Sequence, residues 1–430
     1  MHIFFSGIGG TAIGPLALIA RQAGFDVSGS DKQDSQYIDY LRRKGIEGIT
    51  IEQTTEAITS RHEQKPIDWY VYSSAVAIEQ PDNPELTFVE SHGIRTSKRD
   101  ELIRYITEEK NLQMIAIAGT HGKTTTTAMT IWLFKQLGIP VSYSVGAKIE
   151  FGDMGHYDPG SKYFIYEADE FDRNFLTFSP VLSIITGIDW DHQDIYPTRE
   201  DYNTAFRQFI EQSQRVCIWH DDADKLDVLP NEKIAILKKN DYPLSALLGR
   251  VNRENANIVA QAVMQLLGKD TFLEIIEILD LFPGVSRRFE KITDNIYSDY
   301  AHTPPKIRGA LQIAQETANQ NVVVVYEGLH NTRQHFIKDE LADLFIGIKK
   351  LYIVPSYRAR EDQSLEDLTP EKLRDILTSP ADIEPSTLNQ TLSGKIQAHA
   401  EAGDVVLCLS ASGGGSLDEW LRRQFKKQLA

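Results

Sequence analysis

A glycine-rich turn with a lysine and several threonines is the stretch of this sequence best suited to chemistry. The turn consists of Gly119, Thr120, His121, Gly122, Lys123, Thr124 and Thr125. An apolar run precedes it and an apolar helical pattern follows it. The backbone N–H groups of such a strand–turn–helix corner, together with the positive end of the helix, favour a phosphate group. Lys123 adds charge for terminal phosphates, and the hydroxyl of Thr124 is a ligand for Mg²⁺.

The turn departs from the common phosphate-loop pattern G-x-x-x-x-G-K-[ST] at one position, because Ile117 stands where the first glycine is usual. We therefore expect the turn to begin at Gly119. The structural alternative is a strand-to-helix corner that carries a surface lysine. Two glycines, a lysine and four consecutive threonines seldom coincide at such a corner, so we prefer the phosphate-binding interpretation.

A second glycine-rich turn lies at the N-terminus, after the apolar residues Ile3-Phe4-Phe5. Its residues are Gly7, Ile8, Gly9 and Gly10. With Ala12 they make a G-x-G-x-x-A pattern, and the next predicted strand ends at Asp31. This βαβ fingerprint is typical of a ligand with a diphosphate and a ribose. NAD is the usual ligand, a nucleotide sugar is a rarer one, and glycines placed only for tight packing are the structural alternative.

Polar residues follow two further apolar runs. Glu167 ends the aromatic run that starts at Lys162, and His192 follows the run that starts at Val181. Ligands of parallel sheets bind at the carboxyl ends of strands, so Glu167 should lie beside the phosphates, where a carboxylate can bind Mg²⁺. The alternative for Glu167 is a solvated acidic loop. Imidazole suits softer metals than Mg²⁺, so the residue type alone favours a hydrogen-bonding role for His192.

The last part of the chain places charged residues at a turn and after a strand. Arg288 lies in a pair of arginines that can bind phosphate or form a surface ion pair with Glu290. Asp299 and His302 lie where a strand ends and a helix with proline in its first turn begins. Asn255 stands in an asparagine cluster at the start of a helix, where the residue type alone favours a cap.

Apolar runs alternate with helical patterns through the sequence, which predicts an α/β fold with largely parallel sheets. A chain of 430 residues is too long for one ordinary core. We expect three domains, namely a Rossmann-like domain at 1–105, a central P-loop ATPase-like domain at 106–283 and a second Rossmann-like domain at 284–430. The first boundary lies where the sequence becomes charged, and the second at a Pro-Gly turn.

The composition limits which classes of partner and which cellular compartment we expect for this protein. The formal charge of −16, from 61 acidic and 45 basic residues, disfavours nucleic acid and anionic membranes as partners. Cys217 and Cys408 show neither disulfide nor metal spacing, which fits a reducing cytoplasm. The N-terminus has no signal-peptide pattern, and no stretch approaches the roughly 18 apolar residues of a membrane span. We therefore expect a cytoplasmic protein that is not inserted in a membrane.

Taken together, the motifs resemble those of the Mur ligases, which are ATP-dependent, amide-bond-forming enzymes of peptidoglycan synthesis. Each motif is modest alone, but their joint order over nearly the whole chain is specific. The resemblance rests on residues 7–10, 27–31, 73–75, 119–124, 167–170 and 191–192, on Asn252 and Asn255, and on residues 287–290 and 299–304.

The resemblance implies an ATP site that several segments share. Its candidate residues are the turn at 119–125, Asn255, Arg288 and Asp299. Thr124 and Glu167 would hold one Mg²⁺, and His192 would help to hold a second. The candidate catalytic residues are then Lys123, Glu167 and His192.

The resemblance also implies UDP-N-acetylmuramate as a substrate of the first domain and an amine as a substrate of the third. The candidate residues for the UDP end are Gly7, Ile8, Gly9, Gly10, Asp31 and Ser73. The candidate residues for the amine are His302 and Arg333. The sugar-borne carboxylate would attack the γ-phosphate of ATP to give an acyl phosphate, a reaction that needs charge neutralisation and alignment more than an acid or a base.

Within the family, the N-terminal motifs and His121 resemble the ligases that add L-alanine to UDP-N-acetylmuramate. The stretch 191–197 and Phe171 instead favour relatives that attach a recycled murein tripeptide. Departures from the family pattern at Gly187, Val251 and residues 330–333 leave the choice between an amino acid and a short peptide open. We expect a monomer or a homodimer.

Two functions of other classes remain open at this point. The N-terminal fingerprint alone would fit an NAD-dependent oxidoreductase, although such an enzyme has no use for Lys123 and Thr124. A nucleotide-driven switch or partner-binding ATPase would hydrolyse ATP without an acceptor. A ligase should release phosphate only when the UDP-sugar and the correct amine are both present.

Overall fold

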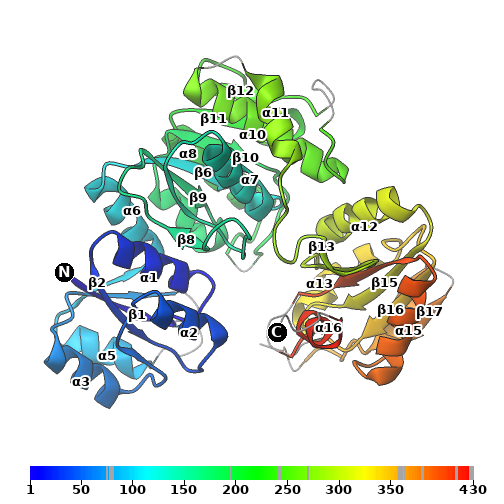
Figure 1. Cartoon of the computed structure of the whole chain (residues 1–430), viewed down its shortest axis with the longest axis horizontal. Helices are drawn as coiled ribbons and strands as arrows, with labels where there is room; N and C mark the ends of the chain where they lie inside the picture. The colour runs from blue at the N-terminus through cyan, green and yellow to red at the C-terminus, as the bar shows by residue number, and fades with distance from the viewer. Residues whose placement is uncertain are drawn as a thin grey trace. The chain divides into compact units, whose positions relative to one another are not determined.

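The computed structural model describes residues 1–73, 76, 82–193, 195–239, 245–268, 271–356, 362, 364–378, 382–411 and 415–425. The chain divides into two compact units, whose helices and strands are labelled in Figure 1. One unit comprises Met1–Ser245 with Asn255–Pro283, and the other comprises Ala246–Glu254 with Gly284–Ala430. Of the sequence motifs, residues 74, 75 and 194 lie outside the described ranges.

The first sheet has five parallel strands in the order β3-β2-β1-β4-β5. The strands are β1 (His2–Ser6), β2 (Asp26–Ser30), β3 (Ile49–Thr50), β4 (Trp69–Tyr72) and β5 (Arg95–Lys98). The helices are α1 (Ile13–Gln22), α2 (Gln36–Arg43), α3 (Thr55–Gln64), α5 (Pro84–Ser91) and α6 (Arg99–Glu109). Successive side chains of a strand point to opposite faces. Phe5 therefore joins the core beneath α1 and α6, whereas Phe4 packs with Ile58 and Phe88 from α3 and α5.

The second sheet carries the predicted phosphate loop and has seven strands in the order β12-β11-β10-β6-β9-β7-β8. All neighbouring strands are parallel except β7 and β8. The strands are β6 (Gln113–Ala118), β7 (Val141–Ser144), β8 (Gly155–His156), β9 (Tyr163–Glu167), β10 (Leu182–Ile185), β11 (Val216–Trp219) and β12 (Ile234–Leu237). Because β6 lies between β9 and β10, the carboxyl ends of these three strands meet where the loop begins.

Helices and one 3₁₀ segment complete this part of the chain. They are α7 (Lys123–Gln136), η1 (Phe171–Thr177), α8 (Arg199–Gln212), α9 (His220–Lys225), α10 (Arg250–Leu267) and α11 (Phe272–Asp280). Helix α7 packs on β6, β7 and β9 and also against α11. Apolar residues and buried threonines are therefore spread around α7 instead of forming one stripe.

The first two sheets share one apolar core. Trp69 from β4, Leu102 from α6 and Met114 from β6 belong to the same cluster of buried residues. Helix α1 also packs against β8, so closely that a Cβ atom on Gly155 would lie 2.3 Å from the carbonyl oxygen of Pro15. This continuous core explains why the residues of the first two predicted domains form one compact unit, except Ala246–Glu254, which belong to the other unit.

The second unit is built on a six-stranded sheet in the order β13-β14-β18-β15-β16-β17, which is parallel except for the pair β13 and β14. The strands are β13 (Glu290–Thr293), β14 (Ile296–Asp299), β15 (Val322–Glu327), β16 (Lys350–Val354), β17 (Ile383–Pro385) and β18 (Val405–Leu409). The helices are α12 (Pro304–Ala318), α13 (Asn331–Leu341), α14 (Pro370–Ile376), α15 (Gln390–Glu401) and α16 (Leu417–Phe425).

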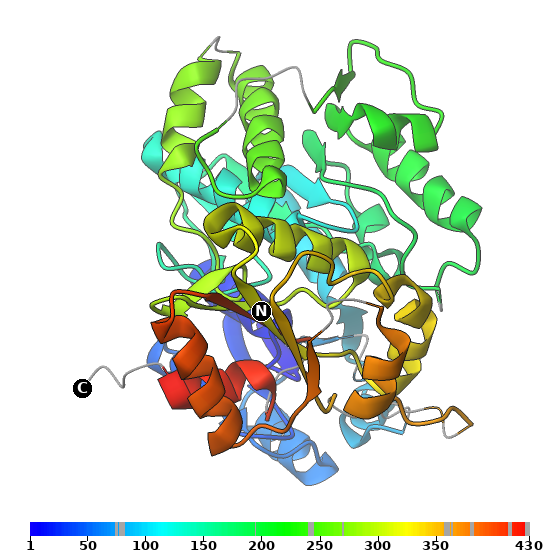
Figure 2. The same ribbon diagram turned by 90° about the vertical axis from the view of Figure 1, so that its right-hand side faces the viewer.

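Strand β15 shows how this sheet is buried on both faces. It is a run of β-branched valines, which suits a central parallel strand. Val322 and Val324 pack with residues of α12, α13 and α14, whereas Val323 and Val325 pack with residues of α15 and α16. Figure 2 shows α15 and α16 on one side of the sheet and α13 and α14 on the other.

Three largely parallel sheets covered by helices confirm the predicted α/β class. Among the helices of the described ranges, none combines the length and the apolar composition that a membrane span needs.

Candidate active site

The loop at 119–125 has the backbone of a phosphate cradle. Ile117 is fully buried within β6, so the turn does begin at Gly119. Gly119 has φ +134°, and a Cβ atom there would lie 2.6 Å from Thr186 Oγ1. Gly122 has φ +79° and precedes α7 without a side-chain cap. Only glycine suits these two positions, and the uncapped N–H groups of the first turn of α7 remain available for an anion.

The loop is fixed to the segment that follows β10. The N–H of Thr120 donates to the carbonyl of Gly187 at 2.8 Å, and the Thr120 hydroxyl donates to the carbonyl of Asp189 at 2.7 Å. The N–H of Asp189 donates back to the Thr120 hydroxyl at 2.9 Å, and the Tyr202 hydroxyl lies 2.7 Å from the same oxygen. Thr120 is buried, so its side chain positions the loop and does not face solvent.

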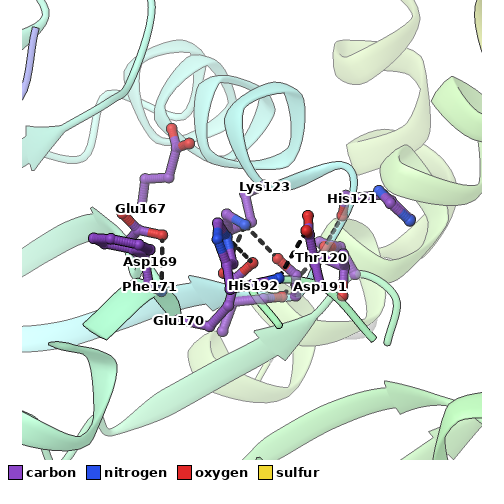
Figure 3. A network of polar contacts seen from close by, with 12 residues as sticks. Thr120, His121, Lys123, Glu167, Asp169, Glu170, Phe171, Asp191 and His192 are labelled. Atoms are coloured by element: carbon purple, nitrogen blue, oxygen red, sulfur yellow. Dashed lines mark hydrogen bonds and ion pairs between the residues drawn. The ribbon is translucent and has the colours of Figure 1, made fainter. Parts of the chain in front are cut away.

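His121 points away from Lys123 in Figure 3. Its Nε2 lies 3.2 Å from Asp189 Oδ2. The imidazole of His121 beside it lowers the pKa of Asp189 to about 2, with a further contribution from the charge of Lys225. The imidazole therefore holds the outside of the loop to the Asp189 segment.

Lys123 is engaged by protein groups inside the loop. Its Nζ donates to Glu170 Oε2 at 2.7 Å and to the carbonyl oxygen of Gly119 at 2.5 Å (Figure 3). Burial lowers the pKa of Lys123, but the charges of Glu170 and Asp169 outweigh that effect and raise it overall. The lysine is thus a half-buried cation with a buried counter-ion. Sequence analysis did not single out Glu170, although it stands in the same acidic run as Glu167.

Thr124 and Glu167 lie close together, because β6 and β9 are neighbouring strands whose carboxyl ends lie at the same edge of the sheet. The Thr124 hydroxyl donates to Glu167 Oε1 at 2.8 Å, and the N–H of Gly146 donates to Glu167 Oε2 at 2.8 Å. A hydroxyl and a carboxylate are the hard oxygen ligands that Mg²⁺ binds beside phosphate oxygens and water. Within the described residues, no cluster of three or more histidine, cysteine, aspartate or glutamate side chains is arranged for a metal.

His192 lies next to the acidic run. Its Nε2 is 3.8 Å from Glu170 Oε1, and its ring packs edge-on against Phe171 with centroids 5.1 Å apart. The residue has φ +55°, and its N–H donates to Asp191 Oδ1 at 2.8 Å. The structure therefore brings His192, Lys123 and Glu167 to the same edge of the central sheet.

Asn255 is not a helix cap, so the interpretation from the residue type alone was wrong. It lies inside α10 and is 3% exposed. Its Oδ1 is 3.1 Å from the position of a Cβ on Gly122, and its Nδ2 has no hydrogen-bond partner among the residues that the structure describes. Buried amide groups are nearly always satisfied, so an unpartnered donor beside the loop fits a nucleotide site. Thr125, in the first turn of α7, is half-buried.

The N-terminal glycine turn also has a tight geometry. The N–H groups of Gly7 and Ile8 both donate to the carbonyl of Ser30, and Gly10 donates to the carbonyl of Gly7. The N–H of Gly9 donates to Asp31 Oδ2 at 2.8 Å. A Cβ on Gly9 would lie 2.9 Å from that same oxygen, so the carboxylate of Asp31 can approach only a glycine.

Ser73 follows β4 and is half-buried, and its carbonyl accepts the N–H of Val76. Because β1, β2 and β4 are neighbours, Ser73 lies at the same edge of the first sheet as the glycine turn and Asp31. Within the described residues, the candidate UDP residues therefore share one sheet edge.

In the second unit, three of the candidate residues gather where β13 begins and β14 ends: Arg288 lies just before β13, Asp299 is the last residue of β14, and His302 follows it. Asp299 Oδ2 accepts the N–H of Phe289 at 2.7 Å, and burial raises the pKa of Asp299 to about 6 despite the charge of Arg288. The guanidinium of Arg288 lies 5.2 Å from the centre of the Tyr300 ring. His302 packs edge-on against that ring and binds the carbonyl of Tyr300 through Nδ1 at 2.8 Å.

Burial holds the pKa of His302 well below its usual range, and the charges of Lys306 and Arg333 act in the same direction. Arg333 lies in the first turn of α13. His302 is therefore a neutral imidazole near cationic side chains, an environment suited to an anionic group such as the carboxylate of an amino acid.

Relatives of known name match almost the whole chain. A protein of Lachnospira eligens named UDP-N-acetylmuramate–L-alanine ligase is 30% identical over 94% of this chain and 96% of its own length. A protein of the same name from Carboxydothermus hydrogenoformans is 30% identical over 84% of this chain and 83% of its own length.

Solved structures agree in fold. The crystal structure of UDP-N-acetylmuramate-alanine ligase from Thermotoga maritima superposes with a TM-score of 0.78 at 25% identity, covering 99% of this chain and 98% of that chain. A murein peptide ligase from Psychrobacter arcticus gives a TM-score of 0.66 at 22% identity, with full coverage of both chains. The fold is therefore the three-domain Mur ligase fold.

Three family models match consecutive parts of the sequence. Residues 2–111 match "Mur ligase family, catalytic domain", residues 117–243 match "Mur ligase middle domain", and residues 287–412 match "Mur ligase, glutamate ligase domain". The resemblance inferred from the motifs is confirmed. The chain belongs to the Mur ligase family and is an ATP-dependent, amide-bond-forming ligase.

Proposed function

We propose that this enzyme joins L-alanine to UDP-N-acetylmuramate in the synthesis of peptidoglycan precursors, driven by ATP. The relatives from L. eligens and C. hydrogenoformans carry the name of that reaction. One observation at the site carries the proposal: the loop with Lys123 lies beside the hydrogen-bonded pair of Thr124 and Glu167. Such a site suits phosphoryl transfer, and a hydride-transferring enzyme would have no use for it.

The loop would hold the terminal phosphates of ATP. The N–H groups of the first turn of α7 and the ammonium group of Lys123 would bind phosphate oxygens, and the unpartnered amide of Asn255 would donate to the nucleotide. Thr124 and Glu167 would hold Mg²⁺, with His192 near enough to the same edge to assist a second ion. Bound there, Mg²⁺ neutralises the charge that develops on the transferred phosphoryl group.

The reaction has two steps. A carboxylate oxygen of UDP-N-acetylmuramate attacks the γ-phosphorus, the bond from that phosphorus to the bridging oxygen of ADP breaks, and an acyl phosphate forms. The neutral amine of L-alanine then attacks the acyl carbon, loses a proton, and expels inorganic phosphate as the amide forms. Lys123 stabilises the phosphoryl group in the first step, and alignment of the two substrates supplies most of the remaining acceleration.

The outer domains would supply the other two reactants. The glycine turn at 7–10, with Asp31 and Ser73, would bind the diphosphate and ribose of the UDP-sugar. Arg288 and Asp299 would reach the ATP, and His302 and Arg333 would bind the amine substrate. The recycled murein tripeptide stays an alternative amine, because the stretch 191–197 and Phe171 resemble the relatives that attach it.

Phosphate release would test the proposal directly. The enzyme is incubated with ATP, Mg²⁺ and UDP-N-acetylmuramate, and L-alanine, L-serine, glycine or the murein tripeptide is added separately. We expect rapid release with L-alanine and little release when either the sugar or the amine is omitted. Release only with the tripeptide would reassign the amine, and equal release without any acceptor would refute ligation.

A further inference from the structure

We infer that Glu170 positions Lys123 and competes with the phosphates of ATP for its ammonium group. In the structure, the carboxylate of Glu170 holds the ammonium group of Lys123, and the phosphates of ATP would take its place. Nucleotide binding is then an exchange of one anion for another. This inference rests on the proposed ATP site at residues 119–125 and adds a residue and a step to it.

The contact itself is short and buried. Lys123 Nζ lies 2.7 Å from Glu170 Oε2, and the Glu170 side chain is 1% exposed while that of Lys123 is 16% exposed. The same Nζ donates to the carbonyl oxygen of Gly119 at 2.5 Å, so the lysine folds back over its own loop. A charge pair away from water interacts strongly, because solvent screens it little.

Glu170 is held in place by its backbone, whereas Lys123 has a flexible stem. The carbonyl of Glu170 accepts the hydroxyl of Tyr196 at 2.6 Å and the N–H of Arg173 at 3.1 Å. The preceding residue is fixed as well, because Asp169 Oδ2 accepts a hydrogen bond from Arg99 at 3.0 Å. When a ligand arrives, the lysine is therefore the partner that moves.

The carboxylates of the acidic stretch 167–170 pair with different groups. Glu167 pairs with Thr124 and the N–H of Gly146, whereas Glu170 pairs with Lys123. A phosphate group that binds Lys123 breaks the ion pair between Lys123 and Glu170. The negative charge of the phosphate is then also repelled by the carboxylate of Glu170. Both effects weaken binding of any ligand that needs the lysine, and neither affects a ligand without terminal phosphates.

A matched pair of variants isolates this effect. Glu170→Gln removes the charge and keeps the shape. Asp172→Asn makes the same charge change two residues further on, at a carboxylate that pairs with Lys98. Asp172 has φ 55°, a conformation that asparagine tolerates well, so the control is not strained.

The measurement is the equilibrium dissociation constant of ATP and of AMP, by calorimetry with EDTA present so that metal binding contributes nothing. We expect Glu170→Gln to bind ATP about tenfold more tightly than the unaltered protein, with AMP binding unchanged. Asp172→Asn should bind both nucleotides as the unaltered protein does. Glu170→Asp, which shortens the side chain but keeps its charge, should lie between the two.

Weaker or unchanged ATP binding in both Glu170 variants would overturn the inference, and so would an equal gain in Asp172→Asn. Absence of ATP binding in the unaltered protein would instead refute the proposed nucleotide site.

A thermal unfolding cycle gives an independent readout if Glu170→Gln folds poorly. Lys123→Met should lower the unfolding midpoint, and adding Glu170→Gln should restore most of the loss, because the unpaired buried carboxylate is then gone. Additive losses would also overturn the inference.

Discussion

The charged side chains around the phosphate loop are partly or fully buried in pairs, and each pair joins two segments of the chain. Lys123 meets Glu170, and Arg99 at the start of α6 meets Asp169 at 3.0 Å. An ion that loses its partner inside a protein costs several kcal/mol, so these residues act on the fold as well as on the chemistry. At this scale the residue types predicted Lys123, Thr124 and Glu167, because phosphate and Mg²⁺ require such groups.

Replacement of Lys123 should separate its effect on catalysis from its effect on stability. Lys123→Ala should reduce turnover by about 10²- to 10³-fold, because a charge that stabilises the transferred phosphoryl group is lost. It should also lower the free energy of unfolding by about 3 kcal/mol, since Glu170 is left as an unpaired buried charge. The measurements are phosphate release and denaturant unfolding.

Binding of UDP-N-acetylmuramate to the same variant is the control. The dissociation constant of UDP-N-acetylmuramate should stay within about twofold of its value for the unaltered protein. A tenfold change would correspond to about 1.4 kcal/mol of binding free energy. The reason is that the glycine turn at 7–10 lies on a different sheet from Lys123. If the folded variant no longer bound the UDP-sugar, the assignment of the two ligands to separate sheets would be wrong.

At the scale of elements, the site depends on where strands end. The order of the central sheet places β6 between β9 and β10, and so brings the loop, the acidic run and the His192 segment to one edge. Thr120 then fastens the loop to the segment after β10 through hydrogen bonds to Gly187 and Asp189. The turn is stable only because glycine occupies its strained positions.

Two glycines that lie in contact make a matched test of this geometry. Gly119→Ala should lower the free energy of unfolding by about 1 to 3 kcal/mol and weaken ATP binding at least tenfold, because φ is +134° and the new Cβ would lie 2.6 Å from Thr186 Oγ1. Gly187→Ala should be close to neutral in stability, since a Cβ there meets no atom of the described residues within 4 Å. The measurements are thermal unfolding and ATP binding, and equal effects of the two substitutions would contradict the strain argument.

At the scale of the whole molecule, the candidate residues for one reaction are distributed over two compact units. The phosphate loop and the N-terminal glycine turn belong to the first unit, and Arg288, Asp299 and His302 belong to the second. The proposed reaction would bring ATP, a UDP-sugar and an amine together, and with them the candidate residues of both units. Enzymes with substrates on separate domains commonly achieve this by domain closure.

Small-angle scattering should detect such closure. With an ATP analogue, Mg²⁺ and UDP-N-acetylmuramate all present, the radius of gyration should fall towards the roughly 22 Å of a compact chain of this length. Either ligand alone should produce a smaller change, because only the full set of substrates bridges the domains. An unchanged radius with all ligands bound would exclude closure as a step of the reaction.

The amino-acid sequence by itself determined the α/β class, the phosphate loop, the N-terminal glycine turn and the family, because these depend on local patterns and on their order along the chain. Only the tertiary structure decided the partners of these groups. The pairing of Lys123 with Glu170, the burial of Asn255 beside Gly122 and the attachment of Thr120 to Asp189 join residues 47, 133 and 69 positions apart (170 − 123, 255 − 122 and 189 − 120). Strand order in the central sheet creates the first and the last of these contacts, and helix α10 brings Asn255 to the loop. No local pattern in the sequence specifies which of these elements become neighbours.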